Sequence, residues 1–144
     1  MKLAVINGPN LNLLGTREPE LYGSDTLADM EQRVSTRAGE LGIEVEFFQS
    51  NHEGALIDYI QATSEFDGLI LNPGGYGHTS VALADAIAGV GITVVEVHVT
   101  NIHAREEFRS STYSSRVATA LISGLGIVGY VAALEFLWAK KSGN

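Results

Sequence analysis

Short apolar runs alternate with amphipathic segments along most of the chain. The runs have the length of β-strands and are apolar at nearly every position, whereas apolar residues in the intervening segments recur every three or four positions. The runs predict strands at residues 2–7, 43–49, 68–72, 92–98 and about 117–123. The amphipathic segments predict helices at about residues 26–41, 53–64, 80–89 and 126–140. Strand and helix therefore alternate as in an α/β protein.

Residues suited to helix ends flank two of these segments. Thr26 is followed three residues later by Asp29, which is the spacing of a capping box, and Gly42 suits the end of the same helix. Either Ser50 or Asn51 is expected to cap the second helix with its side-chain oxygen.

The apolar character of the strands indicates how they pair. Strands that are apolar throughout are typical of parallel sheets with helices on both faces. Five such units predict a flavodoxin-like, doubly wound, five-stranded parallel sheet with the strand order 2-1-3-4-5. We expect residues 1–144 to form a single catalytic domain. Long loops in compact α/β domains are usually functional, so we expect the connection at about residues 8–25 to act as a lid.

Composition removes several classes of function. Nine basic and seventeen acidic residues give a net charge of −8, which disfavours nucleic-acid and membrane partners. The chain has no cysteine, so disulfides and thiol nucleophiles are excluded. The first apolar run is too short for a signal peptide, and the apolar stretch near the C-terminus is interrupted by Glu135. We therefore expect a soluble, cytoplasmic protein.

Polar side chains follow the predicted strands at one edge of the sheet, where open α/β sheets bind their ligands. Glu96 and His98 are two positions apart on one strand, so they share a face. An unpaired buried carboxylate is costly. We therefore predict a hydrogen bond between Glu96 and His98, which would orient the imidazole and favour its protonated form, as a general acid requires.

Several other polar residues at this edge also have structural explanations. Asn10 and Asn72 could be turn formers. His78 could help to start the helix that follows it. Arg105 and Arg109 are four positions apart beside two glutamates and could form solvated ion pairs. Residue type alone leaves these alternatives open.

Five segments resemble, in order and spacing, the motifs of the type II 3-dehydroquinate dehydratases (type II dehydroquinases). They are NGPNLNLLGTREPELYG, FFQSNHEGALID, NPGGYGHTSVALADA, EVHVTNIHAREEFR and GLGIVGYVAAL, and together they span nearly the whole chain. The resemblance implies anti elimination of water from 3-dehydroquinate through an enolate, giving 3-dehydroshikimate in the shikimate pathway. It also implies that no metal or organic cofactor is needed and that the chain forms a homododecamer built from trimers.

The resemblance further implies a role for each matching catalytic residue. Tyr22 matches the base that removes the C2 proton, and Arg17 matches the lid arginine beside it. His98 matches the acid that protonates the departing C1 hydroxyl, with Glu96 as its partner. Asn10 matches the residue that, with a water molecule, holds the enolate oxygen.

Other positions match the residues that bind substrate in the family. They are Asn72 and the backbone amides of Val99 and Thr100 for the carboxylate, His78 and Arg109 for the ring hydroxyls, and Asp85 for a neighbouring subunit's site. The chain departs from the pattern at two places. Thr100 stands where many members have serine, and Gly77 stands where many have threonine. Neither change removes the backbone amide or the imidazole that the resemblance requires.

Three other functions are compatible with an α/β fold. An FMN- or phosphate-binding module would need a loop rich in Gly, Ser and Thr after the first strand, where this chain has Pro9 and three asparagines. A non-catalytic interaction protein has no need for Tyr22, Arg17 and a Glu–His pair at one edge. A metal site at His98 and His103 lacks carboxylates at a suitable spacing.

Overall fold

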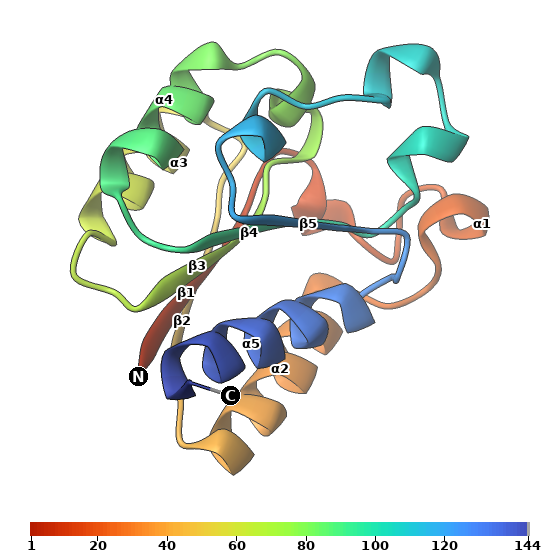
Figure 1. The fold of residues 1–144 in the computed structure, drawn as a ribbon. Helices are drawn as coiled ribbons and strands as arrows, with labels where there is room; N and C mark the ends of the chain where they lie inside the picture. The colour runs from red at the N-terminus through yellow and green to blue at the C-terminus, as the bar shows by residue number, and fades with distance from the viewer. Residues whose placement is uncertain (144) are drawn as a thin grey trace.

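The computed structural model describes residues 1–143 (Figure 1). Five parallel strands form one sheet in the order β2-β1-β3-β4-β5. They are β1 (Lys2–Asn7), β2 (Glu44–Gln49), β3 (Gly68–Asn72), β4 (Val94–His98) and β5 (Ala120–Ser123). The strand order confirms the predicted doubly wound, flavodoxin-like sheet.

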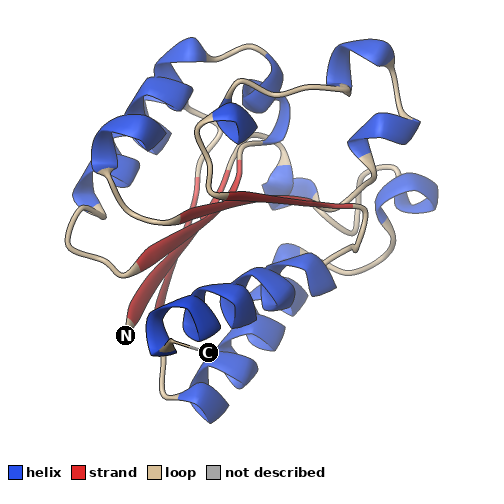
Figure 2. Cartoon of the chain, viewed as in Figure 1, coloured by secondary structure: helices blue, strands red, loops and turns tan. Residues whose placement is uncertain are grey.

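Two pairs of helices cover the two faces of the sheet (Figures 1 and 2). The long helices are α2 (Leu27–Leu41), α3 (Glu53–Ala62), α4 (Val81–Val90) and α5 (Val128–Ser142). Successive residues of β1 point to opposite faces. Leu3 and Val5 join the core beneath α2 and α5, whereas Ala4 and Ile6 join the core beneath α3 and α4. The same alternation decides which face each polar residue at the strand ends occupies.

Most helix and strand ends lie close to their predicted positions. The capping box of α2 is confirmed, because Thr26 Oγ1 accepts from the Asp29 N–H and Asp29 accepts from the Thr26 N–H. The fourth strand begins at Val94 rather than at residue 92. The fifth begins at Ala120 rather than near residue 117, because a 3₁₀ turn around Ser114 binds the N–H groups of residues 117 and 118.

The predicted cap of α3 is wrong. His52 occupies the N-cap position of α3 and makes no side-chain cap. Ser50 Oγ instead accepts from the His52 N–H, and Asn51 Oδ1 accepts from the Asn10 N–H at 2.9 Å. Asn51 therefore holds the loop after β1 against the end of β2.

Two long connections, one between β1 and α2 and one between β4 and β5, contain short helices that the pattern did not predict. The first contains a 3₁₀ helix (Leu11–Leu13) and α1 (Pro19–Tyr22). The second contains three 3₁₀ helices, Ile102–Ala104, Glu107–Arg109 and Ser114–Arg116. These pieces are too short for a 3.6-residue period to show in the sequence. None of the helices within residues 1–143 has both the length and the hydropathy needed to cross a membrane.

Candidate active site

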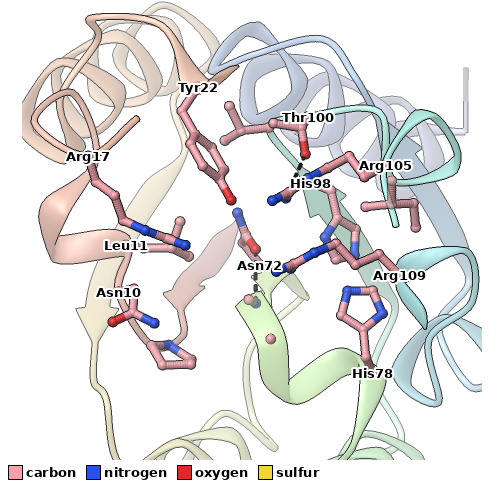
Figure 3. A pocket seen from close by; sticks show the side chains of 15 residues that line it. Asn10, Leu11, Arg17, Tyr22, Asn72, His78, His98, Thr100, Arg105 and Arg109 are labelled. Atoms are coloured by element: carbon pink, nitrogen blue, oxygen red, sulfur yellow. Dashed lines mark hydrogen bonds between the residues drawn. The ribbon is translucent and has the colours of Figure 1, made fainter. Parts of the chain in front are cut away.

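A small pocket lies at the carboxyl edge of the sheet, between the loops that follow β1, β3 and β4 (Figure 3). Its volume is about 120 Å³, below the roughly 300–1,000 Å³ of sites for drug-sized ligands. All but two of the predicted site residues line it: Asn10, Arg17, Tyr22, Asn72, His78, His98, Val99, Thr100 and Arg109. The polar strand ends therefore meet as expected, in a space suited to a small molecule.

Tyr22 and two arginines form one part of this pocket. Tyr22 ends α1 and points its hydroxyl into the pocket (Figure 3). The guanidinium carbons of Arg17 and Arg105 lie 5.3 and 5.2 Å from the centre of its ring. Arg105 also donates to Thr100 Oγ1 at 3.3 Å, which ties it to the loop after β4. Two guanidinium groups therefore lie against the ring of Tyr22 at cation–π distance.

Glu96 and His98 form the predicted hydrogen bond. His98 Nε2 lies 2.6 Å from Glu96 Oε1, and the carboxylate is fully buried behind the imidazole. Because an ionised carboxylate only accepts hydrogen bonds, the ring hydrogen of this contact belongs to Nε2. The other ring nitrogen, Nδ1, is then the one that remains for a ligand in the pocket.

His78 and Arg109 line the pocket beside His98. His78 Nδ1 lies 2.9 Å from the backbone oxygen of Ser111, and since a carbonyl only accepts, Nδ1 donates. In the neutral ring Nε2 then remains as a hydrogen-bond acceptor. Arg109 donates to Glu106 at 2.8 Å, so its charge is partly offset by an exposed carboxylate.

The side chain of Asn72 is held by a hydrogen bond to Tyr130, a residue of α5. Tyr130 Oη accepts from Asn72 Nδ2 at 2.9 Å and donates to Asn7 Oδ1 at 2.6 Å. Asn72 Oδ1 accepts from the Gly74 N–H at 3.1 Å, which fixes the amide at both ends. Burial raises the pKa of the Tyr130 phenol, so the hydroxyl keeps its hydrogen and can donate to Asn7.

The loop after β4 offers backbone donors next to Asn72. Val99 and Thr100 line the pocket, and their backbone N–H groups donate to no backbone carbonyl within residues 1–143. Asn10 lies across the pocket with a backbone φ of 69°, a left-handed conformation that asparagine tolerates better than most residues. Its exposed side chain is available to a ligand.

Of the predicted site residues, Asp85 and Glu96 do not line this pocket, and Glu96 lies behind His98. Asp85 is exposed on α4, away from the pocket lining. His103 is exposed on the 3₁₀ helix Ile102–Ala104, so it does not share a site with His98. Within residues 1–143, no group of three or more His, Asp or Glu side chains could hold a metal ion.

The ionisable side chains that line the pocket include arginines and histidines but no carboxylates. Three arginines and two histidines line the pocket, and none of the lining residues is acidic. The lysines lie elsewhere: Lys2 opens β1 and pairs with Glu46 at 2.6 Å, and Lys141 pairs with Asp67 at 3.0 Å. A pocket with this lining favours an anionic ligand although the whole chain carries a charge of −8.

Comparison with known proteins agrees with this geometry. The sequence model of the family described as "Dehydroquinase class II" matches residues 1–138. The chain belongs to the class II dehydroquinases. A 3-dehydroquinate dehydratase from Dinoroseobacter shibae is 59% identical over 140 residues, which cover 96% of this chain and 93% of the relative. A catabolic 3-dehydroquinase from Verticillium alfalfae is 55% identical over 136 residues, which cover 94% of this chain and 91% of the relative.

A solved structure supports the same family. The type II dehydroquinase from Butyrivibrio crossotus superimposes with a TM-score of 0.94 at 44% identity, covering 95% of this chain and 97% of the other. An FMN- or phosphate-binding module is therefore not favoured for this class II dehydroquinase.

In this dehydroquinase the pattern of residues missed three contributors to the site. The sequence offers solvated ion pairs as the explanation of Arg105, and the structure places its guanidinium against the ring of Tyr22. Tyr130 falls within the predicted last helix, residues 126–140, and the sequence pattern gives it no role at the pocket. A phenol on an apolar face needs a partner for its hydroxyl, which was the available signal. Thr112, which donates to Glu96, had no local signal.

Proposed function

We propose that this chain removes water from 3-dehydroquinate to give 3-dehydroshikimate, as its relatives' names indicate for those proteins. The observation that carries the proposal is the pocket itself. It brings Tyr22, with two arginines beside its ring, and His98 to one small, cationic space (Figure 3), and Glu96 holds His98 from behind. A base on one side and an acid on the other suit an anti elimination from a carboxylate substrate.

The first step is removal of the C2 proton. The phenolate of Tyr22 takes this proton, the C2–H bond breaks, and its electron pair forms an enolate whose oxygen is at C3. Arg17 and Arg105 stabilise the phenolate before the transfer. By family resemblance, Asn10 and a water molecule hold the enolate oxygen, where the developing charge needs hydrogen-bond donors.

The second step is loss of the C1 hydroxyl. The enolate re-forms the C3 carbonyl and its electrons form the C1–C2 double bond as the C1–O bond breaks. Protonated His98 gives its Nδ1 hydrogen to the departing oxygen, so water leaves. Buried Glu96 holds the imidazole by Nε2 and offsets its positive charge. The proton that Tyr22 took then returns to solvent and His98 takes a proton from solvent, so both groups regain their starting states and atoms and charges balance.

The remaining polar groups bind the parts of the substrate that do not react. Asn72 and the free amides of Val99 and Thr100 bind the carboxylate. His78 accepts from a ring hydroxyl through Nε2, and Arg109 donates to another. This assignment follows the family resemblance and agrees with the donor and acceptor capacity that the hydrogen bonds leave open.

The proposed function extends to how the chain assembles, how the pocket closes and where the enzyme works. We propose a homododecamer built from trimers, in which Asp85, exposed on α4, reaches a neighbouring subunit's site. Residues 8–25 act as a lid over one catalytic domain, and the enzyme works in the cytoplasm. Light scattering after size-exclusion chromatography tests the assembly, since twelve chain masses are expected and a monomeric mass would refute it.

The test of the reaction is the appearance of enone absorbance when 3-dehydroquinate is added. Tyr22→Phe should lower kcat by about 10²- to 10⁴-fold, the range for loss of a general base. Tyr113→Phe is the matched control, because Tyr113 is exposed and does not line the pocket. His98→Ala should slow net dehydration more than exchange of the C2 proton with deuterium. Absence of enone with the unaltered chain, or near-normal turnover by Tyr22→Phe, would refute the proposal.

A further inference from the structure

The buried carboxylate of Glu96 makes both of its hydrogen bonds through one oxygen. Oε1 accepts from His98 Nε2 at 2.6 Å and from Thr112 Oγ1 at 2.7 Å. Oε2 is buried and has no partner within residues 1–143. Within the part of the chain that the structure describes, the contact with Thr112 is therefore the only hydrogen bond besides that of His98 which determines how this carboxylate is turned.

The hydroxyl of Thr112 has only one way to be arranged. Its oxygen accepts from the Ser115 N–H at 3.0 Å, so its single hydrogen is free to point at Glu96. Thr112 is 2% exposed, and water therefore does not compete for that hydrogen. Ser115 Oγ donates to the Thr112 carbonyl at 3.1 Å, which fixes the backbone as well.

The segment around Thr112 is tied to the other histidine of the pocket. The Tyr113 N–H donates to the Gly77 carbonyl at 2.8 Å, and the Ser111 carbonyl accepts from His78 Nδ1 at 2.9 Å. Two consecutive residues, Ser111 and Thr112, thus hold His78 directly and His98 through Glu96. The rings of the two histidines lie 6.1 Å apart.

From these contacts we infer that Thr112 is a positioning residue for the acid of the elimination. The last torsion of a glutamate side chain is broad, so a carboxylate held at one point only can turn. Without the Thr112 hydroxyl, Glu96 turns and presents either oxygen to His98. The imidazole then loses the fixed orientation that aims Nδ1 at the departing hydroxyl. The inference rests on the proposed function, because it assigns Thr112 to one step of that reaction.

The experiment compares Thr112→Val, which removes the hydroxyl and keeps the branched shape, with Thr112→Ser, which keeps the hydroxyl. Thr63→Val is the matched control. Thr63 is 1% exposed and also donates at 2.7 Å, but to the Ile60 carbonyl at the end of α3, away from the pocket. Each variant is assayed for net dehydration by enone absorbance and for exchange of the C2 proton in D₂O, corrected for exchange without enzyme.

Thr112→Val should lower kcat for dehydration by about 10- to 100-fold, which corresponds to loss of a hydrogen bond to a charged group. Exchange at C2 should fall much less, so the ratio of exchange to dehydration rises. Thr112→Ser should keep both rates within about threefold of the unaltered chain, and Thr63→Val should keep the ratio unchanged. If Thr112→Val does not fold, as judged by circular dichroism, Thr112→Ala provides a second variant without the hydroxyl.

Three results would overturn the inference. They are an unchanged ratio in a folded variant that lacks the hydroxyl, a Thr112→Ser enzyme as impaired as Thr112→Val, or an equal rise in Thr63→Val. These outcomes are distinct from failure of the proposed function, in which the unaltered chain and Thr63→Val would themselves produce no enone.

Discussion

Replacement of Tyr130 by phenylalanine removes one hydroxyl that serves both the core and the pocket. The change leaves Asn7 Oδ1 and Asn72 Nδ2 without the partner they share, and both side chains are buried. Each buried polar group left unsatisfied costs about 1–3 kcal/mol, so we expect the free energy of unfolding to fall by about 3 kcal/mol. That is a large fraction of the roughly 5–15 kcal/mol that stabilises a typical domain.

The matched control is Tyr59→Phe. Tyr59 stacks on Phe48 with ring centres 4.3 Å apart and donates to Glu46 at 3.0 Å, but the Glu46 side chain is 43% exposed. Water can replace the lost donor there, so the cost should stay within about 1 kcal/mol. Both variants are unfolded in urea at one protein concentration, because any association would make stability depend on concentration.

Tyr130→Phe should also change substrate binding. The Asn72 amide keeps only its contact with the Gly74 N–H, so its orientation is less fixed. We expect KM for 3-dehydroquinate to rise more than kcat falls, whereas Tyr59→Phe leaves both unchanged. The reasoning is refuted if Tyr130→Phe is as stable as Tyr59→Phe, or if it loses stability while KM stays at its original value.

Three further outcomes are expected. Gly8→Ala should abolish the folded pocket or make the chain insoluble, because the added Cβ would lie 2.4 Å from the Pro73 carbonyl oxygen. Gly54→Ala is the control, because its added Cβ would have no atom within 4 Å, and the two variants are compared by soluble expression and circular dichroism. The pKa of Tyr59 is raised to about 12, first by burial and then by the hydrogen bond to Glu46. Because the phenol of the unfolded chain ionises at a lower pH than that of the folded chain, the free energy of unfolding should fall as pH rises from about 10 towards 12. Urea unfolding across that range should show a smaller fall in Tyr59→Phe, and an equal fall would contradict the assignment. Borohydride added with 3-dehydroquinate should leave the mass of the chain unchanged, because its lysines lie outside the pocket; a reduced adduct would show covalent chemistry instead.

Sequence was most informative where the deciding interaction is local. Glu96 and His98 share a face because they are two positions apart on one strand, and the structure confirms their hydrogen bond. The regular alternation of strands and helices along the chain predicted a doubly wound sheet with the order 2-1-3-4-5, and the structure confirms that order. The roles assigned to Tyr22, Arg17 and Asn10 came from family resemblance and stay predictions, although the structure places all three at one pocket.

The missed contributors depend on contacts between residues far apart in the chain. Tyr130 meets Asn7 across 123 positions, and Thr112 meets Glu96 across 16, through a loop without periodicity. Strand parity does place Asn7 with Val5 on the face that α5 covers, but only the docked helix shows which of its residues arrives there. The cap of α3 was missed for a related reason, since Asn51 is occupied by a loop from another strand.

The contrast between the pocket and the rest of the surface has a kinetic consequence. An anionic substrate approaching a chain of charge −8 is repelled at long range and attracted only near the three arginines. Salt at physiological strength screens exposed charges beyond about 8 Å and screens partly buried ones much less. Added salt therefore weakens the repulsion first. Encounter with substrate becomes faster, not slower, as ionic strength rises from very low values, and the preference for anions resides in contacts that form after arrival.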